Sequence, residues 1–253
     1  MGELTGRDVP SDADIARTIA ALVRRGVAVT STLAVLESFT GREGAVDERL
    51  PPLLASRIGA DFDAARAGWK DPESQGCRFW VAVVKKEMQF ERQFVAAGGR
   101  LMAGVDPTGW GGVVAGYGDQ RELELLVEAG LTPETAIRVA TVNGADFLYE
   151  GEQVGSIARG LQADLVLVRG NPSAHIGDVR NVELVFKDGV AYDPAALIAA
   201  AQGSVGERDL LRPLWLFPYN LVLVALAVLL AAKIVSDVRQ RRMHFLPSSA
   251  LPP

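Results

Sequence analysis

The sequence is poor in the residues that form disulfides and metal centres. Of its 253 residues only one is cysteine, Cys77, which excludes an intrachain disulfide and any metal site built from cysteine pairs. Only two are histidine, His175 and His244. A conventional histidine-based metal centre would therefore have at most two such ligands from this chain.

An excess of basic residues is also lacking. The formal net charge is −5 and the isoelectric point is near 5.2, so the chain has no basic surface of the kind that binds nucleic acid. Residues 1–26 are acidic and polar before the first apolar positions, which excludes a signal peptide within them. We therefore expect no nucleic-acid partner, and any export signal would lie outside this sequence.

Long uncharged runs are absent except near the C-terminus. Residues 214–232 contain no charged side chain, and the apolar run reaches Val235 if Lys233 extends toward the membrane surface. A buried core helix is the alternative interpretation. Aromatic residues precede the run and basic residues follow it, which predicts a transmembrane helix at 213–235 that contacts the lipid bilayer. The positive-inside rule then predicts a single-pass membrane protein with a cytoplasmic tail at 236–253 and an extracytoplasmic main domain.

The chain has ample material for a core, since 49% of its residues are hydrophobic. Helices are predicted at 11–25, 79–97, 119–130 and 132–148, from capping residues and apolar spacing. Apolar runs at 27–36 and 100–105 predict strands, whereas 37–75 predicts loop with short helices. Alternating strands and helices predict an α/β domain with a parallel sheet over residues 1–150.

The pattern changes after residue 150. Three short strand-like segments, the last with a hairpin signal at Asp188-Gly189, predict a small β-rich unit over 151–200. A linker at 201–212 is expected to follow it. The predicted fold class is therefore α/β with an appended β-rich unit and a C-terminal transmembrane helix.

Residues 103–112, AGVDPTGWGG, carry the strongest local signal for a functional site. Asp106 ends an apolar strand and is followed by a glycine-rich loop, which is how α/β enzymes present a catalytic carboxylate. The Asp-Pro-Thr-Gly sequence also fits an ordinary type I turn. Trp110 has two interpretations: it stacks on a substrate, or it packs against neighbouring residues. The glycines likewise either let a ligand approach the backbone closely or are required only by the geometry of the turn. The predicted substrate loop consists of Gly109, Trp110, Gly111 and Gly112.

The order of several segments resembles a known family. AGVDPTGWGG, GDQRELELLVEAGLTPETAIRVATVNGA, VGSIARGLQADLVLVRGNP and VELVFKDGVAYD together resemble the C-terminal half of an amidohydrolase-superfamily protein, in its imidazolonepropionase-like branch. The resemblance extends over residues 8–200 and includes VAVTSTLAVLESF upstream. It implies the C-terminal part of a (β/α)8 TIM-type barrel, combined with part of a composite β-sandwich.

The resemblance also implies a chemistry. Family members bind one or two divalent metals, commonly zinc, and use metal-activated water to hydrolyse amide or cyclic amide bonds of small molecules. Asp106 corresponds to the aspartate that binds metal and accepts a proton from this water. Asp164 corresponds to an aspartate that opens a strand, for which we expect a structural hydrogen-bonding role. Glu122 and Glu124 are expected at a helix N-terminus and on its solvated face.

The histidine ligands that the resemblance implies are missing. The family holds its metal with a His-x-His pair and two further histidines upstream of the aspartate, but this sequence has no histidine before His175. His175 and His244 are expected at the surface. We therefore expect the chain to correspond to the last third of a family member, with two or three barrel strands and exposed sheet edges that invite association.

Two hypotheses follow from the sequence. In the first, the chain is the C-terminal part of a membrane-anchored, metal-dependent amidohydrolase acting on carbon–nitrogen bonds, inactive by itself. In the second, it is a non-catalytic membrane-anchored remnant that acts as a binding or scaffold protein.

Overall fold

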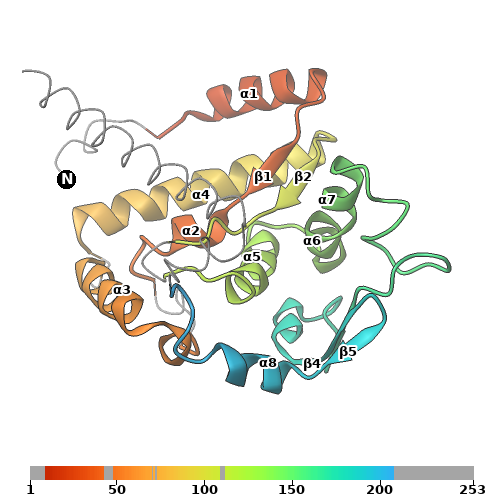
Figure 1. Ribbon diagram of the computed structural model, residues 1–253. Helices are drawn as coiled ribbons and strands as arrows, with labels where there is room; N and C mark the ends of the chain where they lie inside the picture. Colours follow the sequence, from red (N-terminus) through yellow and green to blue (C-terminus); the bar gives the residue numbers. More distant parts are fainter. Residues whose placement is uncertain (1–8, 43–47, 70, 72, 109–111, 208–253) are drawn as a thin grey trace, which may run out of the picture. The chain divides into compact units, whose positions relative to one another are not determined.

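The computed structural model describes residues 9–42, 48–69, 71, 73–108 and 112–207 (Figure 1). These residues belong to one compact unit, Met1–Glu207. Groups of helices separate the short strands over most of this unit, which fits the α/β class that the sequence predicts.

The N-terminal helix forms where the capping pattern predicts it. Helix α1 (Asp12–Arg24) begins after Ser11, whose hydroxyl accepts a hydrogen bond from the Asp14 amide at 3.2 Å. Ile15 and Ile19 are buried on one face of the helix. Gly26, with a φ of 63°, turns the chain toward the first strand.

Two parallel strands form the centre of the α/β part. Strand β1 (Val29–Ser31) pairs with β2 (Leu101–Ala103), with Val29 opposite Leu101 and Ser31 opposite Ala103. Figure 1 shows the two strands side by side. The prediction of a strand over all of 27–36 is only partly confirmed, because the chain turns into helix α2 (Leu33–Glu37) directly after β1.

Helices connect and cover the two strands. Between β1 and β2 lie the 3-10 turn η1 (Pro51–Leu53), helix α3 (Ser56–Gly68) and the long helix α4 (Gln75–Ala96). The Ser74 hydroxyl accepts a hydrogen bond from the Cys77 amide, so α4 begins upstream of its predicted start. After β2 come α5 (Tyr117–Glu128), α6 (Pro133–Ala140) and α7 (Val142–Phe147).

The predicted single helix over 132–148 is divided in two. Thr141 leaves the helical region with φ −128° and ψ −85°, and its hydroxyl donates to the Ile137 carbonyl. This break allows the side-chain Nδ2 of Asn143 to donate to the Leu101 carbonyl of β2 at 2.8 Å. The main core lies among α1, α2, α4, α5, α6 and the two strands, and includes Leu33, Phe94, Leu101, Leu125 and Val139.

A second, antiparallel sheet follows. Strands β3 (Leu165–Val168), β4 (Val182–Lys187) and β5 (Val190–Tyr192) pair in that order, with η2 (Ile176–Arg180) between β3 and β4 and α8 (Pro194–Ala201) after β5. The hairpin at Asp188-Gly189 is confirmed, since both residues have positive φ. The predicted strand in GSIARG is wrong for this structure, where residues 155–160 form no strand.

Asp164 takes the hydrogen-bonding role expected of it. Its carboxylate accepts from the Asp188 amide at 2.8 Å and from Lys187 Nζ at 2.6 Å. These contacts join the residue that precedes β3 to the β4–β5 turn.

The predicted membrane helix requires correction. No helix in the described ranges is both long and apolar enough to cross a bilayer, which contradicts the predicted fold class with its C-terminal transmembrane helix. The longest described helix, α4, is amphipathic and carries the charged residues Arg78, Lys85, Lys86, Glu87, Glu91 and Arg92. The segment predicted to span, 213–235, and the predicted tail lie outside the described residues. The single-pass membrane location, which depended on that helix, is withdrawn with it.

Candidate functional site

The candidate site lies where the two parallel strands end. The Gly104 amide donates to the Ser31 carbonyl at 2.9 Å, so the chain leaving β2 stays joined to the end of β1. Asp106 follows two residues later. It is exposed and has a φ of 46°, a left-handed conformation that aspartate tolerates better than most residues. The structure thus places the predicted carboxylate at the exposed end of the parallel pair.

The loop after Asp106 is closed at its base. The Thr108 amide donates to the Val113 carbonyl, and the Val113 amide donates to the Thr108 hydroxyl, both at 3.0 Å. Val113 is buried and packs, like Val105, against Gly118 near the start of α5. At Gly118 an added Cβ would lie 2.2 Å from Val105 Cγ2, so only glycine permits this close approach.

The structure describes one of the four residues of the predicted substrate loop. Gly112 is described and is buried, whereas Gly109, Trp110 and Gly111 lie outside the described residues. The alternative, a type I turn over 106–109, includes Gly109 and therefore also stays a prediction. The substrate-loop assignment therefore stays a prediction.

The described residues do not fit a catalytic zinc. Within the described ranges, no group of three or more His, Cys, Asp or Glu side chains could hold a metal ion. Such a zinc needs about three protein ligands, and Asp106 supplies one. His175 is exposed, as predicted, and precedes η2. His244 lies outside the described residues.

A buried carboxylate near the strand ends was missed by the sequence analysis. Glu122 of α5 is fully buried, so its expected place at a solvated helix end is wrong. It accepts hydrogen bonds from the Ser31 hydroxyl and from the amides of Leu33 at 3.2 Å and Ala34 at 2.8 Å. Burial raises the pKa of Glu122, and these three donors oppose the rise. Its spacing from Leu125 and Leu126, on the apolar face of α5, is the sequence signal that indicates burial.

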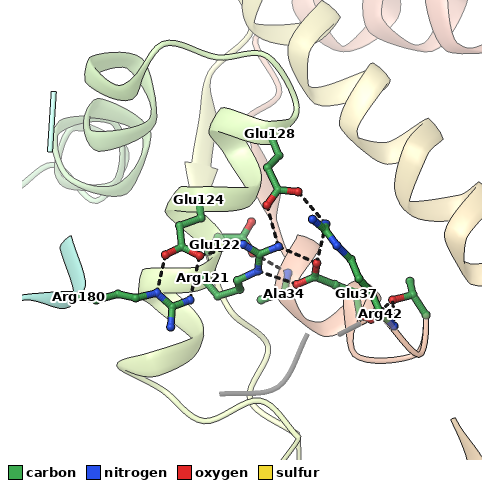
Figure 2. A network of polar contacts seen from close by, with 9 residues as sticks. Ala34, Glu37, Arg42, Arg121, Glu122, Glu124, Glu128 and Arg180 are labelled. Atoms are coloured by element: carbon green, nitrogen blue, oxygen red, sulfur yellow. Dashed lines mark hydrogen bonds and ion pairs between the residues drawn. The ribbon is translucent and has the colours of Figure 1, made fainter. Parts of the chain in front are cut away.

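A separate ion-pair network begins at Arg121, the residue before Glu122 on α5 (Figure 2). Arg121 of α5 binds Glu37 of α2 in bidentate fashion, with nitrogen–oxygen distances of 2.8 and 2.7 Å. Glu37 is almost fully buried, with 1% of its side chain exposed. Arg42 donates to the same Glu37 and to Glu128. The network therefore anchors α2 and the segment after it to α5.

Glu124 extends the network to η2, which connects β3 and β4. It accepts from Arg121 and from Arg180 of η2, as Figure 2 shows. Burial alone would raise the pKa of Glu124, but the two guanidinium groups hold it below its usual value. The expectation of a solvated Glu124 is therefore also wrong, since only 15% of its side chain is exposed.

The chain is similar to known proteins along most of its length. A model of the amidohydrolase family matches residues 3–192. Adenine deaminase 2 of Jannaschia sp. is 41% identical over 73 residues, which cover 28% of this chain and 12% of that protein. Imidazolonepropionase of Herpetosiphon aurantiacus is 44% identical over 62 residues, covering 23% of this chain and 14% of that protein. The matched regions are thus a small part of each relative.

Solved structures share the fold over more of the chain. A bottromycin amidohydrolase superposes with a TM-score of 0.58 at 22% identity, covering 76% of this chain and 45% of that one. Phenylurea hydrolase B superposes with a TM-score of 0.50 at 20% identity, covering 76% and 37%. This chain therefore spans less than half the length of these proteins.

The curated relatives include adenine deaminases as well as an imidazolonepropionase. The similarity therefore supports the superfamily and not one branch of it. The family model matches about three quarters of the sequence, from residue 3 to residue 192. The chain belongs to the amidohydrolase family.

Proposed function

We propose that this chain is the C-terminal part of a metal-dependent amidohydrolase of the imidazolonepropionase-like branch. Its substrate would be a small molecule with a non-peptide amide or cyclic amide bond, cleaved at carbon–nitrogen. The observation that carries the proposal is the place of Asp106, exposed at the end of a parallel strand in a member of the amidohydrolase family. Catalytic groups of barrel enzymes lie at this end of the strands.

The surroundings of Asp106 suit a carboxylate that accepts a proton. The loop base at Thr108 and Val113 and the Ser31–Gly104 hydrogen bond fix the backbone on both sides of it. A carboxylate held in this way can take a proton from water as the water attacks an amide carbon. Gly109, Trp110, Gly111 and Gly112 would form the adjoining substrate loop in the same proposal.

Amidohydrolase family members generally use divalent metals, and zinc is the metal we propose for the complete protein. Because the described residues do not fit such a metal, we infer that histidine ligands come from a further polypeptide segment. The purified chain by itself is then expected to hydrolyse no amide.

The test combines the chain with the missing segment. The reading frames upstream of the Met1 codon are sequenced, any segment with a His-x-His pair is co-expressed with the chain, and a panel of N-acyl amines and cyclic amides is assayed. We expect activity only from the combination. Asp106→Asn should lower it by a factor of roughly 10² to 10⁴, the usual contribution of a general base. Asp63→Asn, which changes an exposed aspartate on α3, is the matched control and should leave the rate unchanged.

Two results would overturn the proposal. Hydrolysis by the chain alone, with stoichiometric metal in elemental analysis, would show that it is not an inactive part. The second result has three parts: the upstream reading frames encode no histidine-bearing segment, the chain binds no metal, and it hydrolyses no amide. That result would favour a non-catalytic binding role.

A further inference from the structure

The C-terminal half of α4 carries a carboxyl group that the proposed hydrolase chemistry does not use. Glu91 is fully buried, with 0% of its surface exposed. Among the described residues, no donor forms a hydrogen bond to either of its carboxylate oxygens. An ionised carboxylate without partners is among the costliest groups to bury, whereas a protonated one is far cheaper.

The neighbouring carboxylate is in the opposite situation. Glu122 accepts from the Ser31 hydroxyl and from two backbone amides, and these donors satisfy it as an anion. The Ser31 hydroxyl has one proton, which it donates to Glu122. It therefore has none for Glu91 in this arrangement, and of the two buried acids Glu91 is the one suited to hold a proton.

The charges near Glu91 favour the same state. The carboxylates of Glu122 on α5 and Glu87 on α4 act on Glu91, and both carry a negative charge. On α1, which also packs against α4, Asp12 is engaged by Lys86 at 2.5 Å. Burial, joined by the two carboxylates, raises the pKa of Glu91 to about 8, although the nearby Ser31 hydroxyl acts to lower it.

We propose that Glu91 is a buried, proton-bearing carboxyl group whose deprotonation draws the Ser31 hydroxyl away from Glu122, and so acts as a switch at the end of β1. An ionised Glu91 needs a donor, and the Ser31 hydroxyl lies near enough to act on this carboxyl group. Glu122 would then keep only the two backbone amides of α2. Because the Ser31 carbonyl also holds the Gly104 amide, the switch lies at the joined ends of the two strands. It does not depend on the proposed hydrolase activity.

The direction of the pH effect follows from proton linkage. In the unfolded chain a glutamate titrates near 4.5, whereas in the folded chain Glu91 titrates near 8. Between these values the folded protein keeps a proton that the unfolded protein loses, so stability falls as pH rises through this window. The stabilising contribution is complete below the lower value and is lost above the upper one.

The first experiment measures the thermal midpoint of the full chain from about pH 5 to about pH 9. We expect the thermal midpoint of wild type to fall relative to that of Glu91→Gln as pH rises, because glutamine does not titrate. This relative fall should level off once the pH exceeds the pKa of Glu91, about 8. The control is Glu152→Gln, an exposed glutamate, whose profile should run parallel to wild type. A Glu91→Gln profile parallel to wild type would overturn the proposal.

The second experiment needs no change at Glu91. In wild-type protein labelled with 13C at glutamate carboxyl groups, one resonance should titrate with a midpoint near 8. In Ser31→Ala this midpoint should move upward, because the anion has lost the Ser31 hydroxyl, which acts to lower the pKa of Glu91. A spectrum in which every glutamate titrates below about pH 6 would refute the buried proton. An unchanged midpoint in Ser31→Ala would refute the role of the serine in the switch.

Discussion

Asp106 combines an exposed carboxylate with a left-handed backbone, and the two properties can be tested separately. Aspartate and asparagine tolerate positive φ, but a β-branched side chain meets the following carbonyl there. The conformation thus restricts which residues can replace Asp106, whatever its chemical role. This constraint comes from its φ of 46° and not from any contact of the carboxylate.

At the residue scale we predict that Asp106→Val destabilises the fold by roughly 1–2 kcal/mol, whereas Asp106→Asn changes it little. Urea unfolding followed by circular dichroism measures both. Asp63→Val on α3 is the control for an exposed aspartate in ordinary helical conformation. Equal stability of the valine and asparagine variants at position 106 would show that the backbone there relaxes without strain.

At the scale of elements, α2 depends on α5 for its place. It is a short helix of five residues, too short to be stable alone. Glu122 accepts from the first amides of α2, and Arg121 binds Glu37 at the other end of it. Adjacent residues of α5 therefore hold both ends of α2.

We predict that Arg121→Met destabilises the protein by about 3–5 kcal/mol, because it leaves the buried Glu37 carboxylate without its bidentate partner. Arg138→Met, an exposed arginine on α6, is the matched control and should cost less than about 0.5 kcal/mol. Chemical denaturation of both variants provides the measurement. A loss at Arg121 no larger than that at Arg138 would mean that Glu37 takes up a proton or another partner at little cost.

At the scale of the whole described unit, the second sheet is thinly covered. Its strand order leaves β3 and β5 at the edges, and Val166 and Leu167 of β3 are 60% and 49% exposed. Exposed apolar edge strands pair readily with other chains. Association through sheet edges, expected from the sequence, therefore remains a proposal with a specific location.

We predict that the purified chain self-associates and that Val166→Lys, which places a charge on β3, shifts it toward monomer. Light scattering after size exclusion, over a range of concentrations, measures the mass. Glu183→Lys changes charge on the central strand β4 and serves as the control. Identical masses for wild type and Val166→Lys would locate association elsewhere or exclude it.

The sequence by itself determined the helix starts at Ser11 and Thr132, the turn at Asp188-Gly189, the parallel α/β pattern and the family. These signals are local, since a cap or a turn depends on residues a few positions apart. The same sequence suggested one strand where β1 and α2 lie, and one helix where α6 and α7 lie. In both cases a hydrogen-bond partner distant in the sequence decided the outcome: Glu122 for α2 and Leu101 for α7.

Only the tertiary structure decided which acidic residues are buried. Glu91 and Glu122 lie on amphipathic helices, and spacing puts Glu122 on the same face of α5 as Leu125 and Leu126. Spacing by itself does not establish that a charged side chain is buried on such a face. Burial followed from the packing of α4 and α5 around the end of β1, where Ser31 and the amides of α2 supply the donors for Glu122. A sequence pattern records which residues share a face, but the free energy of a buried charge depends on the donors that the fold brings to it.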